Sequence, residues 1–293
     1  MIETKRPPQS IRREIIGLPR NGVELALHLW RPRAKAKGAV FYFHGLQSHA
    51  GWLWEVGPQF ADNDIAFFVL DRRGSGISGG LRRELPNAAT LLSDYAAAVE
   101  YARDMVGDDV PLSLFGHCLG GSFMAALMHQ TDFRTRYDAA IFCSTWLGKL
   151  HATLNEEQQA ALAAETSEEL WDAGLKSEDF TDIAKHRHFI DHDDLAVRKL
   201  TRRSRTALLE LEKLYMAPER DLPAVPAAFV SGIGDPIIDL GDTHRTFLKM
   251  TAGQGALIQF ATRKHYLFYT DVRARLVDWA SAFTLLQGLD RNA

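Results

Sequence analysis

The residues that point most directly to chemistry are the six from Gly116 to Gly121, which read Gly-His-Cys-Leu-Gly-Gly. They follow the apolar run 110–115, typical of a buried strand, and lead into the small apolar residues 121–129, typical of a helix. A strand, a tight turn and a helix in this order form a nucleophile elbow, whose strained turn exposes one side chain. Cys118 stands at that position, in front of the free N–H groups and positive dipole of the helix. The sequence therefore predicts a thiol nucleophile.

Beyond the elbow, four further elements make the chain resemble the α/β-hydrolase family, and within it the branch of monoacylglycerol lipases and lysophospholipases. They are His44-Gly45 after the first long strand, the Asp-x-x-Gly-x-Gly-x-Ser loop 71–78, the glycine-then-Asp loop 232–236 and the histidine loop 264–266. The resemblance covers most of the chain. The order nucleophile, acid, histidine is that of the family.

The resemblance implies a catalytic triad of Cys118, His265 and Asp235. His265 takes the proton of the nucleophile, and Asp235 fixes its tautomer and stabilises the imidazolium. The backbone N–H groups of Leu46 and Leu119 form the oxyanion hole. Asp239, four residues after Asp235, is an alternative acid at a position less like that of the family. We expect His44 and His117 to support loops.

The cysteine departs from the family, which usually has serine at the position of Cys118. A thiol beside a helix N-terminus and a protonated histidine has a lowered pKa and attacks as the thiolate. Because thiolate leaves more readily than alkoxide, attack on an oxyester tends to revert, whereas exchange with a thioester is balanced. The cysteine therefore shifts the prediction from lipase towards thioesterase or acyltransferase. The second cysteine, Cys143, ends a predicted core strand and is expected to pack there.

We accordingly expect an acyl ester or thioester hydrolase that forms a covalent acyl-enzyme on a small-molecule substrate with a hydrophobic acyl group. The alternatives are an acyltransferase, which passes the acyl group from a thioester to an acceptor other than water, a catalytically disabled ligand-binding member, and a Ser-to-Cys variant of a lipase-like serine hydrolase. An acyl carrier protein or a coenzyme A thioester is a candidate partner. Trp52, Trp54 and Trp146 are candidates to bind the substrate or, alternatively, to pack the surrounding loops.

The elements that must position these residues alternate along the chain. Near-continuous apolar runs predict buried strands at 38–43, 65–70, 110–115, 139–144, 227–230 and 256–260. Apolar residues three and four apart predict helices at 86–106, 121–129, 156–170, 204–216 and 272–286. Alternation of this kind predicts an α/β fold with a mostly parallel sheet and helices on both faces, as in the α/β-hydrolases.

One segment, residues 146–226, interrupts the alternation, because it has helical patterns and no convincing strand. We interpret it as a helical cap, or lid, over the end of the sheet where ligands bind. The α/β-hydrolase core is then formed by residues 1–145 and 227–293.

Two charged stretches have more than one interpretation. Residues 185–194 hold three His and three Asp, but no pattern fixes a metal geometry, and a solvated cap segment is favoured over a zinc site. Residues 198–205 hold five basic side chains. They either form a solvated helix start or dock a phosphate, such as a phosphopantetheine arm, or an acidic carrier protein.

The composition excludes several classes of protein. Of 293 residues, 34 are Lys or Arg and 37 are Asp or Glu, so the net charge of −3 gives no general attraction to nucleic acid. Two cysteines support neither a disulfide scaffold nor a four-thiolate zinc site. No signal peptide, transmembrane segment, phosphate loop or dinucleotide fingerprint is expected. We therefore expect a cytoplasmic protein without a metal or cofactor.

Overall fold

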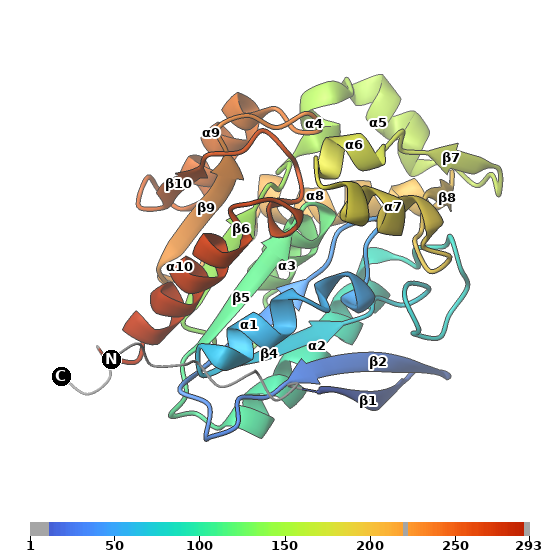
Figure 1. The fold of residues 1–293 in the computed structure, drawn as a ribbon. Coiled ribbons are helices and arrows are strands. Elements are labelled where there is room, and N and C mark those ends of the chain that lie inside the picture. The colour runs from blue at the N-terminus through green and yellow to red at the C-terminus, as the bar shows by residue number, and fades with distance from the viewer. Residues whose placement is uncertain (1–11, 219–221, 290–293) are drawn as a thin grey trace.

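The computed structural model describes residues 12–218 and 222–289. It contains an eight-stranded sheet with the strand order β1-β2-β4-β3-β5-β6-β9-β10 (Figure 1). Strand β2 is antiparallel to both of its neighbours, β1 and β4, and the remaining neighbours pair in parallel. A separate two-stranded sheet consists of β7 and β8.

The strands have the following bounds: β1 Arg13–Arg20, β2 Val23–Trp30, β3 Gly38–Phe43, β4 Ile65–Leu70, β5 Leu112–His117, β6 Ala139–Cys143, β7 Leu170–Asp172, β8 Lys199–Thr201, β9 Ala227–Gly232 and β10 Ala256–Phe260. The α-helices are α1 Val56–Asp62, α2 Ala88–Val106, α3 Leu119–His129, α4 Lys149–Thr153, α5 Glu156–Ala163, α6 Ser177–Phe180, α7 Ala184–His192, α8 Ser204–Met216, α9 Leu240–Met250 and α10 Arg273–Leu286. Two short 3-10 helices cover Ala50–Leu53 and Leu267–Tyr269.

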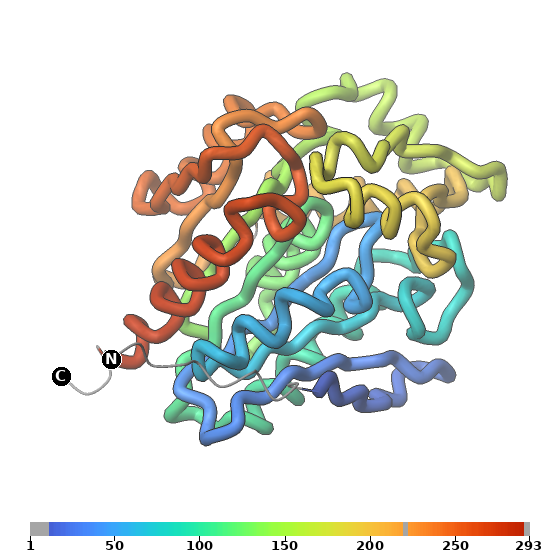
Figure 2. The backbone as a smooth tube through the Cα atoms, viewed as in Figure 1, coloured from blue at the N-terminus to red at the C-terminus, as the bar shows by residue number. Residues whose placement is uncertain are grey.

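The central strands are buried on both faces, as their apolar composition predicts. Every residue of β3, β4 and β5 is buried. Alternate residues of β3 point to opposite faces: Tyr42 joins the cluster formed with α1 and α10, and Phe41 joins the cluster formed with α2 and α3. Figures 1 and 2 show α1 and α10 on the near face of the sheet and α2 and α3 behind it. The sheet is therefore enclosed between two helical layers.

The predicted strands of this sheet are all present. Three have the predicted bounds, and the predicted strand 110–115 is displaced to Leu112–His117. Pro111 has no N–H group to donate to a neighbouring strand, which limits pairing at that end. The antiparallel pair β1–β2 was not predicted. It is joined by Asn21 and Gly22, both with positive φ (43° and 80°), as a tight hairpin turn requires.

Residues 146–226 contain helices α4 to α8, but the expectation that they hold no strand is wrong. Leu170–Asp172 pairs antiparallel with Lys199–Thr201, and the predicted helix 156–170 ends at Ala163. Strands of three residues are too short to show a periodicity in the sequence. In Figure 1 this segment lies across one end of the large sheet. Its assignment as a lid distinct from a core formed by 1–145 and 227–293 stays a prediction.

None of the helices within residues 12–218 and 222–289 is long and apolar enough to span a bilayer.

Candidate active site

Cys118 occupies the turn between β5, which ends at His117, and α3, which begins at Leu119. Its backbone has φ 53° and ψ −126°, a conformation that L-residues rarely adopt and that costs about 1–3 kcal/mol. The N–H group of Cys118 donates a hydrogen bond of 3.0 Å to the carbonyl of Cys143 on the neighbouring strand. The turn is thus held in a strained shape by the sheet below it.

Glycines surround this turn because the backbones there are in contact. A Cβ on Gly116 would lie 2.4 Å from the Cα of Gly121, and a Cβ on Gly120 would lie 2.0 Å from the carbonyl oxygen of Phe43. Real Cβ atoms do not approach other atoms so closely. Glycine is therefore required by the packing at Gly116 and Gly120, on either side of Cys118.

His265 and Asp235 form a buried ion pair on the loops that follow β10 and β9. Nδ1 of His265 lies 2.9 Å and 3.1 Å from the two carboxylate oxygens, and both side chains are fully buried. Asp235 also accepts hydrogen bonds from the backbone N–H groups of Ile237 (2.8 Å) and Ile238 (3.1 Å). Burial would raise the pKa of Asp235, but His265 and these N–H groups lower it below its ordinary value. The carboxylate therefore keeps the proton of the imidazole on Nδ1.

The thiol of Cys118 and the imidazole of His265 shift each other's pKa values. Burial raises the pKa of Cys118, but His265 and the N–H group of Leu119 lower it, and the net pKa lies below the ordinary value. Burial lowers the pKa of His265, but Cys118 and Asp235 raise it to about 10. Nε2 of His265 has no hydrogen-bond partner among the described residues, so we attribute the mutual shift to charge. The negative charge of a thiolate and the positive charge of an imidazolium therefore favour each other at this site.

Asp239, the alternative acid, lies at the N-terminus of α9, where its carboxylate accepts the backbone N–H of Asp242 at 2.9 Å. The structure therefore brings Asp235, and not Asp239, to His265. His117 lies beside the site with its ring 5.1 Å from that of His265, and burial lowers its pKa to about 3. A neutral His117 is consistent with its predicted role in supporting the loop.

The loop that carries Leu46 passes close to Cys118, since a Cβ on Gly45 would lie 3.2 Å from the Cβ of Cys118. The buried guanidinium of Arg72 donates to the carbonyls of Gly45 (3.2 Å) and Leu46 (3.1 Å). Because the N–H and C=O groups of a trans peptide point in opposite directions, the N–H of Leu46 points away from Arg72. His44 supports the same loop, accepting the backbone N–H of Arg72 on Nε2 (3.0 Å), and burial lowers its pKa to about 3.

Arg72 is a residue that the sequence reasoning missed. It lies inside the quoted loop 71–78, and its exposed fraction of 2% marks it as a buried cation. The loop motif includes Arg72, but nothing in the motif indicates a role for its side chain. The fold shows that its guanidinium contacts and orients the loop that carries Leu46.

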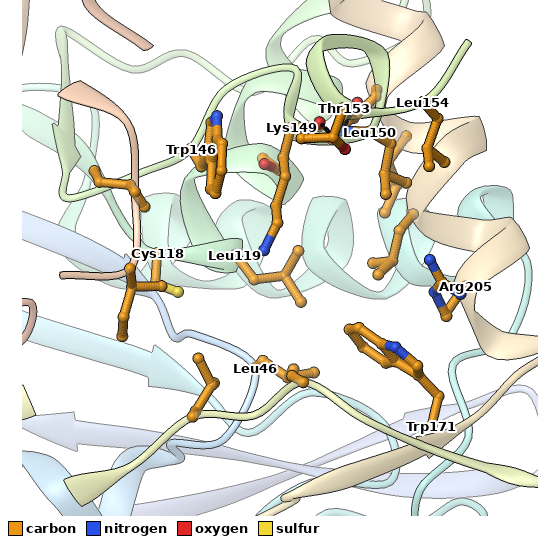
Figure 3. A pocket seen from close by; sticks show the side chains of 18 residues that line it. Leu46, Cys118, Leu119, Trp146, Lys149, Leu150, Thr153, Leu154, Trp171 and Arg205 are labelled. Atoms are coloured by element: carbon orange, nitrogen blue, oxygen red, sulfur yellow. Dashed lines mark hydrogen bonds between the residues drawn. The ribbon is translucent and has the colours of Figure 1, made fainter. Parts of the chain in front are cut away.

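A cavity of about 180 Å³ opens beside Cys118 (Figure 3). Its wall is mainly apolar and combines residues that follow the strands with residues of segment 146–226. The apolar part of the wall consists of Leu46, Leu119, Trp146, Leu150, Leu154, Trp171, Ala173, Leu175, Leu208, Leu211, Ile237 and Ile238. Such a cavity suits a hydrophobic acyl chain.

Of the three tryptophans predicted to bind substrate, only Trp146 lines this cavity. Trp52 is fully buried in the core, where it stacks on Tyr269 and donates its indole N–H to Asp193 at 2.6 Å. Trp54 is 46% exposed and packs under the ammonium group of Lys185. Neither Trp52 nor Trp54 lines this cavity, and in this structure both have the packing contacts that the sequence analysis gave as the alternative.

The His- and Asp-rich stretch 185–194 includes α7 and is less solvated than expected. His186 is 2% exposed, stacks on Tyr269 and contacts Glu55 at 2.8 Å. Asp193 accepts hydrogen bonds from His49 (2.9 Å) and Trp52 (2.6 Å). These contacts fasten α7 to the elements beneath it. Across the described part of the chain, no three His, Cys, Asp or Glu side chains are arranged to hold a metal ion.

The comparisons with known proteins agree with this geometry. The family described as serine aminopeptidase, S33, matches residues 34–271. A monoacylglycerol lipase from Mycolicibacterium smegmatis is 30% identical over 105 residues, which are 36% of this chain and 37% of that protein. A monoglyceride lipase from Mus musculus is 29% identical over 115 residues, 39% of this chain and 38% of that protein. The matches thus span less than two fifths of these curated relatives.

The fold is shared with solved structures. A soluble variant of monoglyceride lipase from Saccharomyces cerevisiae, in complex with a substrate analog, superposes with a TM-score of 0.78 over 95% of this chain and 97% of that one, at 15% identity. A likeness at this identity shows the fold, and it is the mostly parallel α/β-hydrolase fold predicted from the sequence. Together with the family match over residues 34–271, this likeness shows that the chain belongs to the serine aminopeptidase S33 family and has the α/β-hydrolase fold.

Proposed function

We propose that the protein is a carboxylic ester or thioester hydrolase that acts through Cys118 and a covalent acyl-enzyme. The observation that carries the proposal is the pairing of a strained thiol of lowered pKa with the buried His265–Asp235 pair, at the wall of an apolar cavity. Such perturbed pKa values are typical of catalytic groups. The curated relatives are named as monoacylglycerol and monoglyceride lipases, which supports an ester-cleaving activity.

In the first half of the proposed reaction, the thiolate of Cys118 attacks the carbonyl carbon of the substrate. A carbon–sulfur bond forms, and the carbonyl electrons move to the oxygen. This oxygen accepts hydrogen bonds from the backbone N–H groups of Leu46 and Leu119. When this intermediate collapses, the bond to the leaving group breaks. The leaving alcohol or thiol takes the proton from Nε2 of His265, and the acyl group stays on Cys118.

In the second half, Nε2 of the now neutral His265 takes a proton from water as the oxygen attacks the acyl carbon. The carbon–sulfur bond breaks, the acid leaves, and the thiolate–imidazolium pair is restored. Asp235 stays charged throughout and stabilises the imidazolium. An amine or alcohol in place of water would turn the same cycle into acyl transfer.

The nature of the nucleophile favours thioesters. With an oxyester, the intermediate carries a thiolate and an alkoxide as possible leaving groups, and the thiolate of Cys118 leaves more readily, which returns the substrate. With a thioester the two leaving groups are both thiolates, so the forward reaction competes evenly. We therefore expect acylation to be faster from thioesters than from matched oxyesters.

Intact-mass spectrometry tests the proposal directly. The wild-type protein and the Cys118→Ala and Cys118→Ser variants are incubated with thioesters and oxyesters of short and long acyl chains. We expect an acyl adduct on the wild type, faster from thioesters, and none on Cys118→Ala. Cys118→Ser is the matched control for chemistry, because it keeps the elbow and should reverse the preference towards oxyesters.

The decay of the adduct separates the two classes of acyl chemistry. Loss in water at the rate of turnover supports a hydrolase, whereas loss only with added amines or alcohols supports an acyltransferase. Absence of any adduct and of any turnover from every donor would refute the proposal and favour a catalytically disabled, ligand-binding member.

A further inference from the structure

The basic run 198–205 contains one side chain that differs from the others. Its remaining cations have partners outside the cavity: Lys199 pairs with Asp172, Arg202 with Glu169, Arg203 with Glu84 and Glu168, and Arg198 donates to the carbonyls of Ile190, Asp191 and Asp193. Arg205 instead lines the cavity that contains Cys118, with its guanidinium 4.7 Å from the centre of the Trp171 ring. No carboxylate of the described residues lies within ion-pair distance of it.

A half-buried guanidinium on an apolar wall is an unusual feature. Burial, followed by the nearby charge of Arg202, lowers the pKa of Arg205 and outweighs the opposite effect of Glu165, so the surroundings oppose its charge more than they support it. The Trp171 ring offsets part of this cost through a cation–π contact. The hydrogen-bonding edge of the guanidinium, suited to a bidentate anion, has no acidic partner from the described chain.

Lys149 is a second cation on the same wall. Its ammonium group lies 4.7 Å from the centre of the Trp146 ring, and its charge contributes to the lowered pKa of Cys118. Figure 3 shows its side chain reaching into the cavity, between Cys118 on one side and Arg205 on the other. Lys149 likewise has no carboxylate within ion-pair distance among the described residues.

The acidic residue on this wall does not balance these cations. Glu212 accepts the backbone N–H groups of Leu150 (3.0 Å) and His151 (3.1 Å) and the Nδ1 atom of the His151 ring (2.8 Å). Its carboxylate is therefore held by the start of α4 and by His151. The cavity therefore has two cations without an ion-pair partner among the described residues, on a mainly apolar wall.

We propose that Arg205, assisted by Lys149, binds an anionic group of the substrate across the cavity from Cys118. The substrate is then an acyl ester or thioester that carries, besides its hydrophobic part, a carboxylate, phosphate or sulfate. The proposal rests on the proposed function and specifies its substrate class. The anion has two possible sources, the far end of the acyl chain or the leaving group.

Two pairs of probes distinguish these sources. The first pair compares a decanoyl thioester of N-acetylcysteamine with the same thioester bearing a terminal carboxylate on the acyl chain. The second pair compares decanoyl N-acetylcysteamine with decanoyl coenzyme A, whose leaving group carries phosphates. Acylation of Cys118 is followed by intact mass and turnover by thiol release, for the wild type and for Arg205→Gln, Arg205→Lys and Lys149→Gln.

We expect kcat/KM to be about 10- to 100-fold higher for the anionic member of one pair, because a charge-assisted hydrogen bond contributes about 1.5–3 kcal/mol. Arg205→Gln should bring this ratio close to one, and Arg205→Lys should restore part of it. Lys149→Gln should lower the ratio by a smaller factor, and it supplies the test should Arg205→Gln not fold. The control is Arg202→Gln, which removes a neighbouring cation with its own acidic partner and should leave the ratio unchanged.

The outcomes separate the two proposals. One outcome would overturn the anion site and leave the proposed hydrolase intact. In that outcome acylation needs Cys118, anionic and neutral probes react at the same rate, and Arg205→Gln does not change their ratio. Absence of acylation from all probes would overturn the proposed function itself.

Discussion

The strained backbone of Cys118 predicts that glycine at this position is more stabilising than alanine, which is the reverse of its usual effect. Replacing alanine with glycine normally lowers the free energy of unfolding by about 0.4–1 kcal/mol, because glycine has more freedom in the unfolded chain. At Cys118 the backbone lies at φ 53° and ψ −126°, a conformation that glycine adopts without steric strain and that costs other residues about 1–3 kcal/mol. We therefore expect Cys118→Gly to be more stable than Cys118→Ala.

The comparison of the two variants isolates the backbone. Both lack the thiol and its interaction with His265, so only the strain and the freedom of the unfolded chain differ. Glycine avoids the strain of about 1–3 kcal/mol and loses about 0.4–1 kcal/mol through the greater freedom of the unfolded chain. The difference favours Cys118→Gly by about 1 kcal/mol. For a chain of 293 residues, that corresponds to a rise in the melting temperature of about 2 °C.

Calorimetry or urea denaturation of the two variants measures this difference. Ala126→Gly, in the buried middle of α3, is the control, because its backbone is helical and glycine there should cost at least about 0.5–1 kcal/mol. Should Cys118→Gly melt below Cys118→Ala by a similar amount, the turn stores no strain, and the reasoning for the elbow is wrong.

Four further predictions concern the site. Asp235→Asn removes the charge that holds the proton of His265 on Nδ1, and the rate of acylation should fall by about 10²- to 10⁴-fold while thioester binding persists; an unchanged rate would exclude its orienting role. The acylation rate should rise as pH passes upward through the lowered pKa of Cys118 and fall again above about pH 10, where His265 loses its proton. Cys118→Ser removes the thiolate that raises the pKa of His265, so an NMR titration should find that pKa well below 10, and an unchanged value would argue against the ion pair. Gly120→Ala places a Cβ 2.0 Å from the carbonyl oxygen of Phe43, and the forced backbone shift should lower the free energy of unfolding by about 1–3 kcal/mol in urea, whereas wild-type stability would contradict the close packing.

The central sheet was predictable because its strands are buried on both faces and therefore read as unbroken apolar runs, as in residues 38–43 and 65–70. The β1–β2 hairpin was missed because β1 is mostly exposed and carries charged side chains and a proline. The dipeptide Asn21-Gly22 is the signal that would have indicated it.

Cys118, His265 and Asp235 could be proposed from the sequence as a triad because each lies in a short motif that closely follows a strand. The wall of the cavity was not. Trp52 is held away from the cavity by Asp193, which lies 141 residues further along the chain. Arg205 reaches the cavity because α8 begins just after β8, whose pairing with β7 also positions Trp171. Contacts between residues so distant in the chain leave no local pattern in the sequence.

The division of the cavity between two parts of the chain has a consequence for how this protein can diverge. Cys118, His265 and Asp235 are carried by loops that follow β5, β10 and β9, whereas most of the opposing wall belongs to residues 146–226. Within that segment, the backbone of Asp179 accepts the N–H of His265 at 2.9 Å, whereas Trp171 and Leu208 line the cavity. Substitutions at the cavity-lining positions can therefore change which molecules fit while the contacts that hold the imidazole stay in place. These positions, rather than the whole segment, are the ones to vary when a new specificity is engineered.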